Sequence, residues 1–442
     1  MSVLNLSLES VRLWKNAFKS QELTILGSEE AFRKTTKYAF EHTAFYPAFW
    51  AKKGFCPKDL DSVEPPDIPI LTKQDIRDYC EDPSCDGTFL NSQFKRFLSK
   101  KPVIIQSSGS TGLPTKFLYS QKALTTVEAN FIRLSNLGGK TRVGFRDLPV
   151  RALHAASIGD GYASSVLLSE GLSKYHARCL LLNTTEPLGE WPGKIADFQP
   201  NYLSGYPSCL SLLLKLQMEG KIKLDPLKII SGGEPLTKAL KRDLQEVFKA
   251  DVVDFYGCSE SLLLGAGSSW YEGIYLFDDM NYTEIDREGH LIITPLYNLA
   301  MPLIRYKLDD IVCGFTRSFD GPLPFTHIDK IIGRDNDILW FINEVGARDF
   351  LHPLALDDII ADGLKEFQIV RMSDWSFRVD CIADHPSGNT KTNISRQLDD
   401  ILEKKHMKNV RYEIRFCAHL KRNARSGKVP LTVSTTAEKD EV

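Results

Sequence analysis

A run of hydroxyl side chains and glycines, QSSGSTGLPTK at 106–116, is the first part of the chain whose residue types favour a specific chemistry. It directly follows the apolar PVII at 102–105, so the pattern predicts a strand that ends in a loop. Hydroxyl groups donate hydrogen bonds, and glycines let the backbone approach an anion because they carry no Cβ atom. An ordinary polar loop is the alternative when this pattern is taken alone. The residues of the predicted polyphosphate loop are Ser107, Ser108, Gly109, Ser110, Thr111 and Gly112.

Three further stretches carry glycines, carboxylates and aromatic rings where predicted strands end. They are SGGEPLT at 231–237, DFYGCSE at 254–260 and IRYKLDD at 304–310. In α/β sheets, ligands collect where strands end and loops begin. The chain contains no G-x-x-x-x-G-K-[ST] sequence, which argues against ordinary P-loop kinases and ATPases.

Taken together, the four stretches resemble, in order and spacing, the adenylate-forming superfamily of acyl- and aryl-CoA ligases. Within it, the chain is similar to the phenylacetate-CoA ligase branch, including its capsule-biosynthesis relatives. FYPAFWAKKG and IPILTKQDIR near the N-terminus and RSGKVPL near the C-terminus carry the same resemblance, which therefore spans nearly the whole chain. It implies that a carboxylate attacks the α-phosphate of ATP and expels pyrophosphate, with ATP and Mg²⁺ as cofactors and coenzyme A as a further one.

The resemblance also implies roles for individual residues. The loop at 107–112 would hold the β- and γ-phosphates, and Glu260 would be a magnesium ligand and catalytic residue, a hard oxygen donor for a hard cation. Tyr256 would stack on adenine, and Asp310 would accept hydrogen bonds from both ribose hydroxyls. Asp309 stands where the family often has glycine, so which of the two carboxylates faces the ribose stays open, with Asp310 favoured. The resemblance assigns six further residues to the nucleotide: Gly232, Gly233, Glu234, Gly257, Ser259 and Arg334.

At Gly232 and Gly233 the expected reason for glycine is that a missing side chain leaves room for a ligand. Lys428 in ARSGKVPL matches a catalytic lysine of the family that approaches the α-phosphate, where an ammonium offsets developing charge. A solvent-facing lysine is the alternative, and Lys116 is a lesser candidate. The stretch GRDND matches the hinge between domains, with Asn336 where relatives have Asp, followed by Asp337.

The acid pocket is less clearly marked than the nucleotide site. Positions that match the branch's pocket fall in 154–157, 159–162 and 202–208, and the candidate lining residues are His154, Tyr162, Tyr206 and Gly232. A structural imidazole is the alternative for His154. The sequence does not specify the acid.

The elements that must position these residues follow from hydrophobic periodicity. Helix is predicted from residue 28 to a stop at Gly54, and Thr72 with Asp75 predicts a capping box. Short apolar runs alternate with helices between 150 and 256, which indicates βαβ units and a largely parallel sheet. Beyond Gly273, turns at short intervals and little helical periodicity predict antiparallel strands. We therefore predict the α/β class, with a large adenylation domain over 1–335 and a small mobile α/β domain over 336–442, whose polar end is expected to fray.

Bulk composition limits the alternatives. The chain has 442 residues, 43% hydrophobic and 25% charged, with a formal charge of −2, so no basic field favours nucleic acid. Its 9 cysteines are scattered without zinc spacing, which favours a reducing, cytoplasmic location. No signal peptide or membrane span is expected, and a homodimer is left open.

The leading hypothesis is therefore an ATP-dependent acid ligase that passes an aryl or arylacetic acyl group to coenzyme A. The first alternative keeps adenylation and changes the acceptor to an amine, a sugar or a carrier-protein thiol, or stops at AMP transfer. A nucleotide-binding scaffold without turnover is the alternative of a different class.

Overall fold

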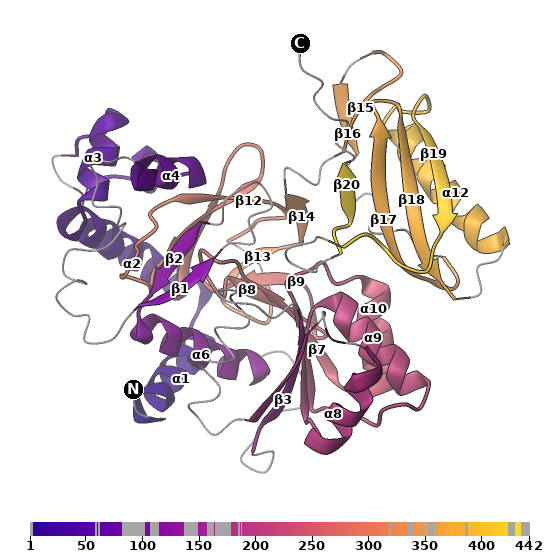
Figure 1. Ribbon diagram of the computed structural model, residues 1–442. Helices are drawn as coiled ribbons and strands as arrows, with labels where there is room; N and C mark the ends of the chain where they lie inside the picture. The colour runs from indigo at the N-terminus through magenta and orange to yellow at the C-terminus, as the bar shows by residue number, and fades with distance from the viewer. Residues whose placement is uncertain are drawn as a thin grey trace.

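The computed structural model describes residues 3–57, 60, 62–81, 102–106, 115–136, 149–156, 163, 178–183, 186, 188–317, 320–334, 339–346, 348–351, 359, 361–384, 388–422 and 429–434. These residues form a mixed α/β fold, which confirms the predicted class (Figure 1). Within them, no helix combines the length and apolarity needed to cross a bilayer. The cysteines whose thiols are described as free are Cys56, Cys179, Cys209, Cys258, Cys313, Cys381 and Cys417.

The N-terminal part is helical, with α1 (Val3–Asn16), α2 (Gln21–His42), α3 (Phe45–Lys52), a short η1 (Pro65–Asp67) and α4 (Lys73–Glu81). The single helix predicted from residue 28 to Gly54 is wrong, because α2 ends at His42 and α3 begins at Phe45. Pro47 explains the break, since its ring would clash with the carbonyl of Thr43 in a continuous helix. The predicted capping box is confirmed: the Thr72 amide donates to Asp75 Oδ2 at 2.9 Å, and the Asp75 amide donates to Thr72 Oγ1 at 3.2 Å.

The largest sheet has eight strands in the order β13-β9-β8-β7-β6-β5-β3-β4. Its parallel half contains β3 (Arg151–Ala156), β4 (Arg178–Asn183), β5 (Tyr202–Gly205), β6 (Lys228–Gly232) and β7 (Asp251–Tyr256). After η5 (Leu188–Glu190), the helices α8 (Trp191–Phe198), α9 (Pro207–Met218) and α10 (Lys238–Phe248) cover one face (Figure 1). The antiparallel half contains β8 (Gly265–Ser268), β9 (Tyr271–Leu276) and β13 (Thr326–Ile328). The predicted βαβ units are confirmed.

A second, antiparallel sheet follows the predicted change of texture, in the order β10-β11-β12-β14. Its strands are β10 (Asn281–Ile285), β11 (His290–Pro295), β12 (Tyr306–Cys313) and β14 (Lys330–Arg334). A hairpin of β1 (Val103–Gln106) and β2 (Lys116–Tyr119) precedes α6 (Gln121–Asn136). The hydroxyl and glycine run therefore connects two paired antiparallel strands.

The C-terminal part contains the pair β15 (Leu339–Ile342) and β16 (Arg348–Leu351) and a sheet of order β19-β18-β17-β20. The strands of this sheet are β17 (Leu364–Ser373), β18 (Ser376–Ala383), β19 (Arg411–Phe416) and β20 (Thr432–Ser434), with α12 (Gly388–Lys404) beside them (Figure 1). The apolar spacing of HPLALDDIIADGLK at 352–365 predicts a helix, but this segment falls largely outside the described residues and its last two positions belong to β17. The predicted fraying of the polar end is wrong at 432–434, because β20 pairs in parallel with β17.

Three hydrophobic clusters underlie these parts. The first joins the N-terminal helices to the second sheet, the second lies under α8, α9 and α10, and the third is drawn from residues between Leu339 and Leu431. The proposed boundary at 335–336 lies outside the described residues and stays a prediction.

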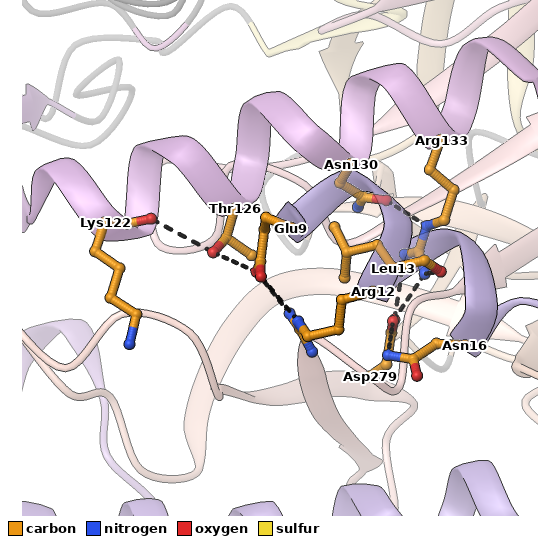
Figure 2. Close-up of polar contacts among 9 residues, drawn as sticks. All are labelled: Glu9, Arg12, Leu13, Asn16, Lys122, Thr126, Asn130, Arg133 and Asp279. Carbon is orange, nitrogen blue, oxygen red and sulfur yellow. Dashed lines mark hydrogen bonds and ion pairs between the residues drawn. The ribbon is translucent and has the colours of Figure 1, made fainter. Parts of the chain in front are cut away.

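A buried ion pair connects α1, α6 and the turn between β9 and β10 (Figure 2). Arg133 Nη1 lies 2.8 Å from Asp279 Oδ2 and also donates to the Leu13 carbonyl at 3.1 Å. Its guanidinium lies 4.6 Å from the ring centroid of Phe277, a cation–π contact. The Arg133 side chain is 0% exposed, so a change of either partner would leave a charge in the core.

Candidate active site

The carboxyl ends of β6 and β7 lie side by side, because Gly232 and Phe255 are paired in their parallel register. Tyr256, the last residue of β7, extends to the second sheet, where its hydroxyl donates a hydrogen bond of 2.8 Å to Oδ2 of Asp310 on β12. Both residues are buried. The structure thus joins two residues that the sequence assigned to the nucleotide and that come from different sheets.

Asp309 and Asp310 occupy different surroundings. Asp309 is exposed, whereas Asp310 is buried and bonded to Tyr256. The antiparallel register of β12 and β14 sets Asp310 opposite Arg334, whose side chain lies outside the described part of the chain. This geometry supports the preference for Asp310, whose ribose role stays a prediction.

The β1–β2 hairpin is attached to the stretch DFYGCSE by two hydrogen bonds. Ser259 Oγ donates to the carbonyl of Gln106 at 3.2 Å, and the Tyr119 hydroxyl donates to the carbonyl of Ser259 at 2.8 Å. Gln106 is the last residue before the predicted polyphosphate loop. The loop residues lie outside the described part, but the strand that leads into them is held beside Ser259.

Glu260, the predicted magnesium ligand, accepts a hydrogen bond of 3.2 Å at Oε1 from the hydroxyl of Tyr306. Burial raises the pKa of Tyr306, and the adjacent Glu260 carboxylate raises it further, so the phenol stays protonated and donates. This contact orients the carboxylate next to Ser259 and the β1–β2 hairpin. A hard oxygen donor held in this way fits a magnesium ion.

Another group of candidate metal ligands lies at the turn between β10 and β11. Asp286, Glu288 and His290 bring ligand atoms within 4.8 Å of one another. The Asp286 carboxylate already accepts from two backbone amides and lies 2.7 Å from Lys307 Nζ. Because an ammonium already balances its charge, this turn gives no reason to move the metal assignment away from Glu260.

Two N-terminal stretches that carry the family resemblance contact the start of β12. The Tyr46 hydroxyl of FYPAFW donates to the carbonyl of Pro302 at 2.9 Å and accepts from the amide of Ile304 at 2.7 Å. In IPILTK, Leu71 forms an isolated bridge with Tyr306. These contacts hold IRYKLDD, and with it Tyr306 and Asp310, in place.

Gly232 of SGGEPLT and Gly257 of DFYGCSE lie too close to other protein atoms to carry a side chain. A Cβ atom at Gly232 would lie 2.5 Å from Cδ1 of Phe255, and one at Gly257 would lie 2.6 Å from Cζ of the same ring. Protein atoms therefore fill the space that was expected to admit a ligand at Gly232. Glycine is needed at both positions: a Cβ atom at Gly232 would also meet the Phe255 carbonyl at 3.0 Å, and one at Gly257 would meet the Leu262 carbonyl at 2.4 Å.

Glu234, assigned to the nucleotide, uses its carboxylate for protein contacts. Oε2 accepts from the Ser208 amide at 3.0 Å, and Oε1 accepts from the Ser208 hydroxyl at 3.2 Å and from the Val429 amide at 3.2 Å. The side chain thus lies between the N-terminus of α9 and the segment after Lys428. Its assignment to the nucleotide stays a prediction.

On the acid side, His154 of β3 lies 2.8 Å through Nδ1 from Ser204 Oγ. Ser204 Oγ donates its own hydrogen to the Leu153 carbonyl at 3.2 Å, so it accepts from the Nδ1–H of His154. Burial lowers the pKa of His154 to about 4, and the ring is neutral. Its Nε2 is buried and has no hydrogen-bond partner among the described residues. Tyr206 is buried nearby, with its amide bonded to the Ala155 carbonyl at 3.0 Å.

Several predicted residues lie outside the described part of the chain. They are Ser107, Ser108, Gly109, Ser110, Thr111, Gly112, Tyr162, Asn336, Asp337 and Lys428. Their roles stay predictions.

Sequence reasoning missed two polar residues that organise this region. Tyr306, the partner of Glu260, was visible only as the aromatic residue of IRYKLDD. Gln368 is 0% exposed on β17 and bonds both ends of the segment 421–430 that carries Lys428. A single amide within the apolar run FQIV was the available signal for Gln368.

Comparison with known proteins agrees with this arrangement. The model of the family described as AMP-binding enzyme matches residues 99–284. The phenylacetate-coenzyme A ligase of Pseudomonas putida is 28% identical over 340 residues, 70% of this chain and 70% of that protein. Protein CapK of Staphylococcus aureus is 23% identical over 338 residues, 70% of this chain and 68% of CapK.

Solved structures share the fold over almost the whole chain. 2-Hydroxyisobutyryl-CoA ligase, in the postadenylation state with 2-HIB-AMP, matches with a TM-score of 0.71 and 19% identity, covering 95% of this chain and 91% of that chain. In the thioesterification state with 2-HIB-AMP and CoA, that ligase matches with a TM-score of 0.55 and 19% identity over the same shares.

Proposed function

The chain is an AMP-forming acid ligase-type enzyme of the AMP-binding, adenylate-forming superfamily, and we propose that it activates a carboxylic acid with ATP and transfers the acyl group to coenzyme A. The observation that carries the proposal is the hydrogen bond between Tyr256 and Asp310, with Glu260 and Ser259 beside it. It brings residues of separate motifs to one place where two sheets meet.

The proposed first half-reaction depends on positioning and charge compensation. Tyr256 lies against adenine, and its hydroxyl orients Asp310 toward the ribose hydroxyls. The loop at 107–112 holds the departing pyrophosphate with backbone amides and hydroxyls, at the end of a strand that Ser259 fixes. A magnesium ion bound at Glu260 would neutralise phosphate charge. Lys428 supplies an ammonium that offsets the charge developing where the acid attacks the α-phosphate.

In the second half-reaction, the C-terminal part rotates about 336–337 and the thiol of coenzyme A attacks the acyl carbon, releasing AMP. The better match to the postadenylation form of 2-hydroxyisobutyryl-CoA ligase than to its thioesterification form supports assigning the present arrangement to the adenylation side. The proposed acid is aryl or arylacetic, supported by the relatives named phenylacetate-coenzyme A ligase.

An alternative acceptor is favoured by one observation, the similarity to protein CapK at 68% coverage of that chain. In this second candidate the acyl group passes to an amine, a sugar or a carrier-protein thiol, or the reaction stops at AMP transfer. Adenylate formation at the same residues is common to both candidates.

Incubation with labelled phenylacetate, benzoate and amino acids in the presence of MgATP tests the proposal. We expect acid-dependent AMP release and a labelled thioester only when coenzyme A is added. A labelled product without coenzyme A, on adding an amine or sugar, would favour the second candidate. Lys428→Ala should abolish adenylate formation while sparing thioester formation from supplied acyl-adenylate, and equal loss of both steps would refute its role.

A further inference from the structure

A contact between two segments far apart in the sequence lies beside the proposed nucleotide residues. The Glu234 carboxylate, just after β6, accepts a hydrogen bond of 3.2 Å from the backbone amide of Val429. The same carboxylate accepts from the amide and hydroxyl of Ser208. One side chain therefore joins the N-terminus of α9 to the segment that follows Lys428.

The N-terminus of α9 fixes this carboxylate independently of the C-terminal part. The helix has 12 residues, and its first amides have no partner within the helix. The helix dipole adds a favourable field for a negative charge at this end. Because the amide and hydroxyl of Ser208 engage both oxygens, Oε1 of Glu234 is held where the Val429 amide meets it.

The docking segment is also fixed within its own sheet. Gln368 Nε2 donates to the carbonyl of Lys421 at 2.9 Å and to that of Pro430 at 2.8 Å, and Oε1 accepts from the Lys421 amide at 3.1 Å. Gln368 thereby closes the base of the loop 421–430. Val429, the residue next in sequence to Lys428, is therefore held through its own amide by Glu234 and through its neighbour Pro430 by Gln368.

Further polar groups lie across the same interface. Glu366 of β17 faces Ser211 of α9, whose side chain lowers the pKa of the Glu366 carboxyl. Burial raises the pKa of Glu366 and the Glu234 carboxylate raises it further, while Arg422 lowers it. The surface between α9 and the C-terminal sheet thus contains two carboxyl groups and a guanidinium, and the Val429 contact is one part of a polar interface.

We infer that Glu234 is a positioning residue of the first half-reaction: its carboxylate, held by the N-terminus of α9, docks the segment that carries Lys428 through the Val429 amide. The functional effect of this contact rests on the proposed function, in which Lys428 acts only in adenylate formation. A different docking point would serve the second half-reaction, in which the C-terminal part is rotated away.

The test compares Glu234→Ala and Glu234→Gln with wild type. Loss of hydrogen bonds to a charged acceptor should slow acid-dependent ATP–pyrophosphate exchange by about ten-fold or more in Glu234→Ala. Thioester formation from supplied acyl-adenylate should change by less than about two-fold. Glu234→Gln keeps one acceptor oxygen and should fall between Glu234→Ala and wild type.

Hydrogen exchange of the peptide containing Val429 supplies a readout that does not depend on activity. We expect faster exchange there in Glu234→Ala than in wild type. Ser20→Ala is the matched control, because Ser20 Oγ caps α2 by accepting from the Leu23 amide at 3.3 Å, far from this interface. The Ser20→Ala variant should have lower thermal stability, with no change in hydrogen exchange at Val429 or in the ratio of the rates of the two half-reactions.

Two results would overturn the inference. One is equal loss of both half-reactions in Glu234→Ala, and the other is unchanged hydrogen exchange at Val429. If wild type shows no activity with any acid, the proposed function fails instead, and the hydrogen-exchange comparison still decides whether Glu234 docks the segment.

Discussion

Gln368 offers the sharpest test of how the C-terminal sheet holds the loop 421–430. Its amide makes three hydrogen bonds to the backbone of Lys421 and Pro430, and the side chain is 0% exposed. Replacement by Leu keeps a similar volume but removes every one of these bonds. Two carbonyl groups and one amide would then lose their partner inside the protein.

The expected cost follows from the number of bonds. A neutral hydrogen bond contributes about 0.5–1.5 kcal/mol net, so three of them give about 1.5–4.5 kcal/mol. The upper part of this range applies if the backbone groups stay buried, because an unsatisfied buried group costs about 1–3 kcal/mol. The loss should be local, since the bonds join only β17 to the two ends of one loop.

Hydrogen exchange of peptides covering β17 and residues 429–434 measures this loss as a fall in the local opening free energy. Gln397→Met is the matched control, because Gln397 of α12 donates to the Asn393 carbonyl one turn earlier in its own helix. We expect a change below about 1 kcal/mol for the control. Equal protection of β17 in Gln368→Leu and wild type would refute the reasoning.

Replacing Arg133 by Met leaves the buried Asp279 carboxylate without the guanidinium of its ion pair, with only the Asn16 amide still donating to it among the contacts in Figure 2. The free energy of unfolding in urea should fall by about 3–5 kcal/mol, and an unchanged midpoint would contradict this. Burial raises the pKa of Asp278 from 3.8 to about 7. The stabilising effect of its bound proton is therefore present at low pH and is lost as pH rises through about 7. Between the two pKa values, the free energy of unfolding falls by about 1.4 kcal/mol per pH unit. Asp278→Asn should therefore gain about 2–3 kcal/mol relative to wild type between pH 5 and pH 7.5, and a difference that does not change with pH would refute the assignment. Tyr256→Phe removes the hydrogen bond to Asp310 and should raise KM for ATP by about ten-fold or more with a smaller change in kcat; an unchanged KM would argue against the ribose role of Asp310.

The parts of the fold that local pattern determines were predictable. The alternation of apolar runs and helices between 150 and 256 predicted the parallel half of the large sheet, and Thr72 with Asp75 predicted the start of α4. Each of these signals is contained within a few neighbouring residues. The break between α2 and α3 was also available in the sequence, because proline is tolerated only in the first turn of a helix, and Pro47 lies in the first turn of α3.

Contacts between distant segments were not predictable in the same way. The run Thr432–Ser434 is too short and too close to a polar tail to predict a strand, and it forms β20 by pairing with β17. The hydrogen bond from Tyr256 to Asp310 requires two sheets to meet, which periodicity does not encode. Likewise, the SGGEPLT motif places Glu234 near the site, but its partners Ser208 and Val429 follow from tertiary packing.

Acid-dependent exchange of labelled pyrophosphate into ATP reports acyl-adenylate formation without needing the acceptor, so it decides whether this protein activates a carboxylic acid. We expect exchange with at least one aryl or arylacetic acid, no exchange without acid, and loss of exchange in Lys428→Ala. Absence of exchange with every acid of a broad aromatic and amino acid panel, by a folded protein that binds ATP, would contradict the claim.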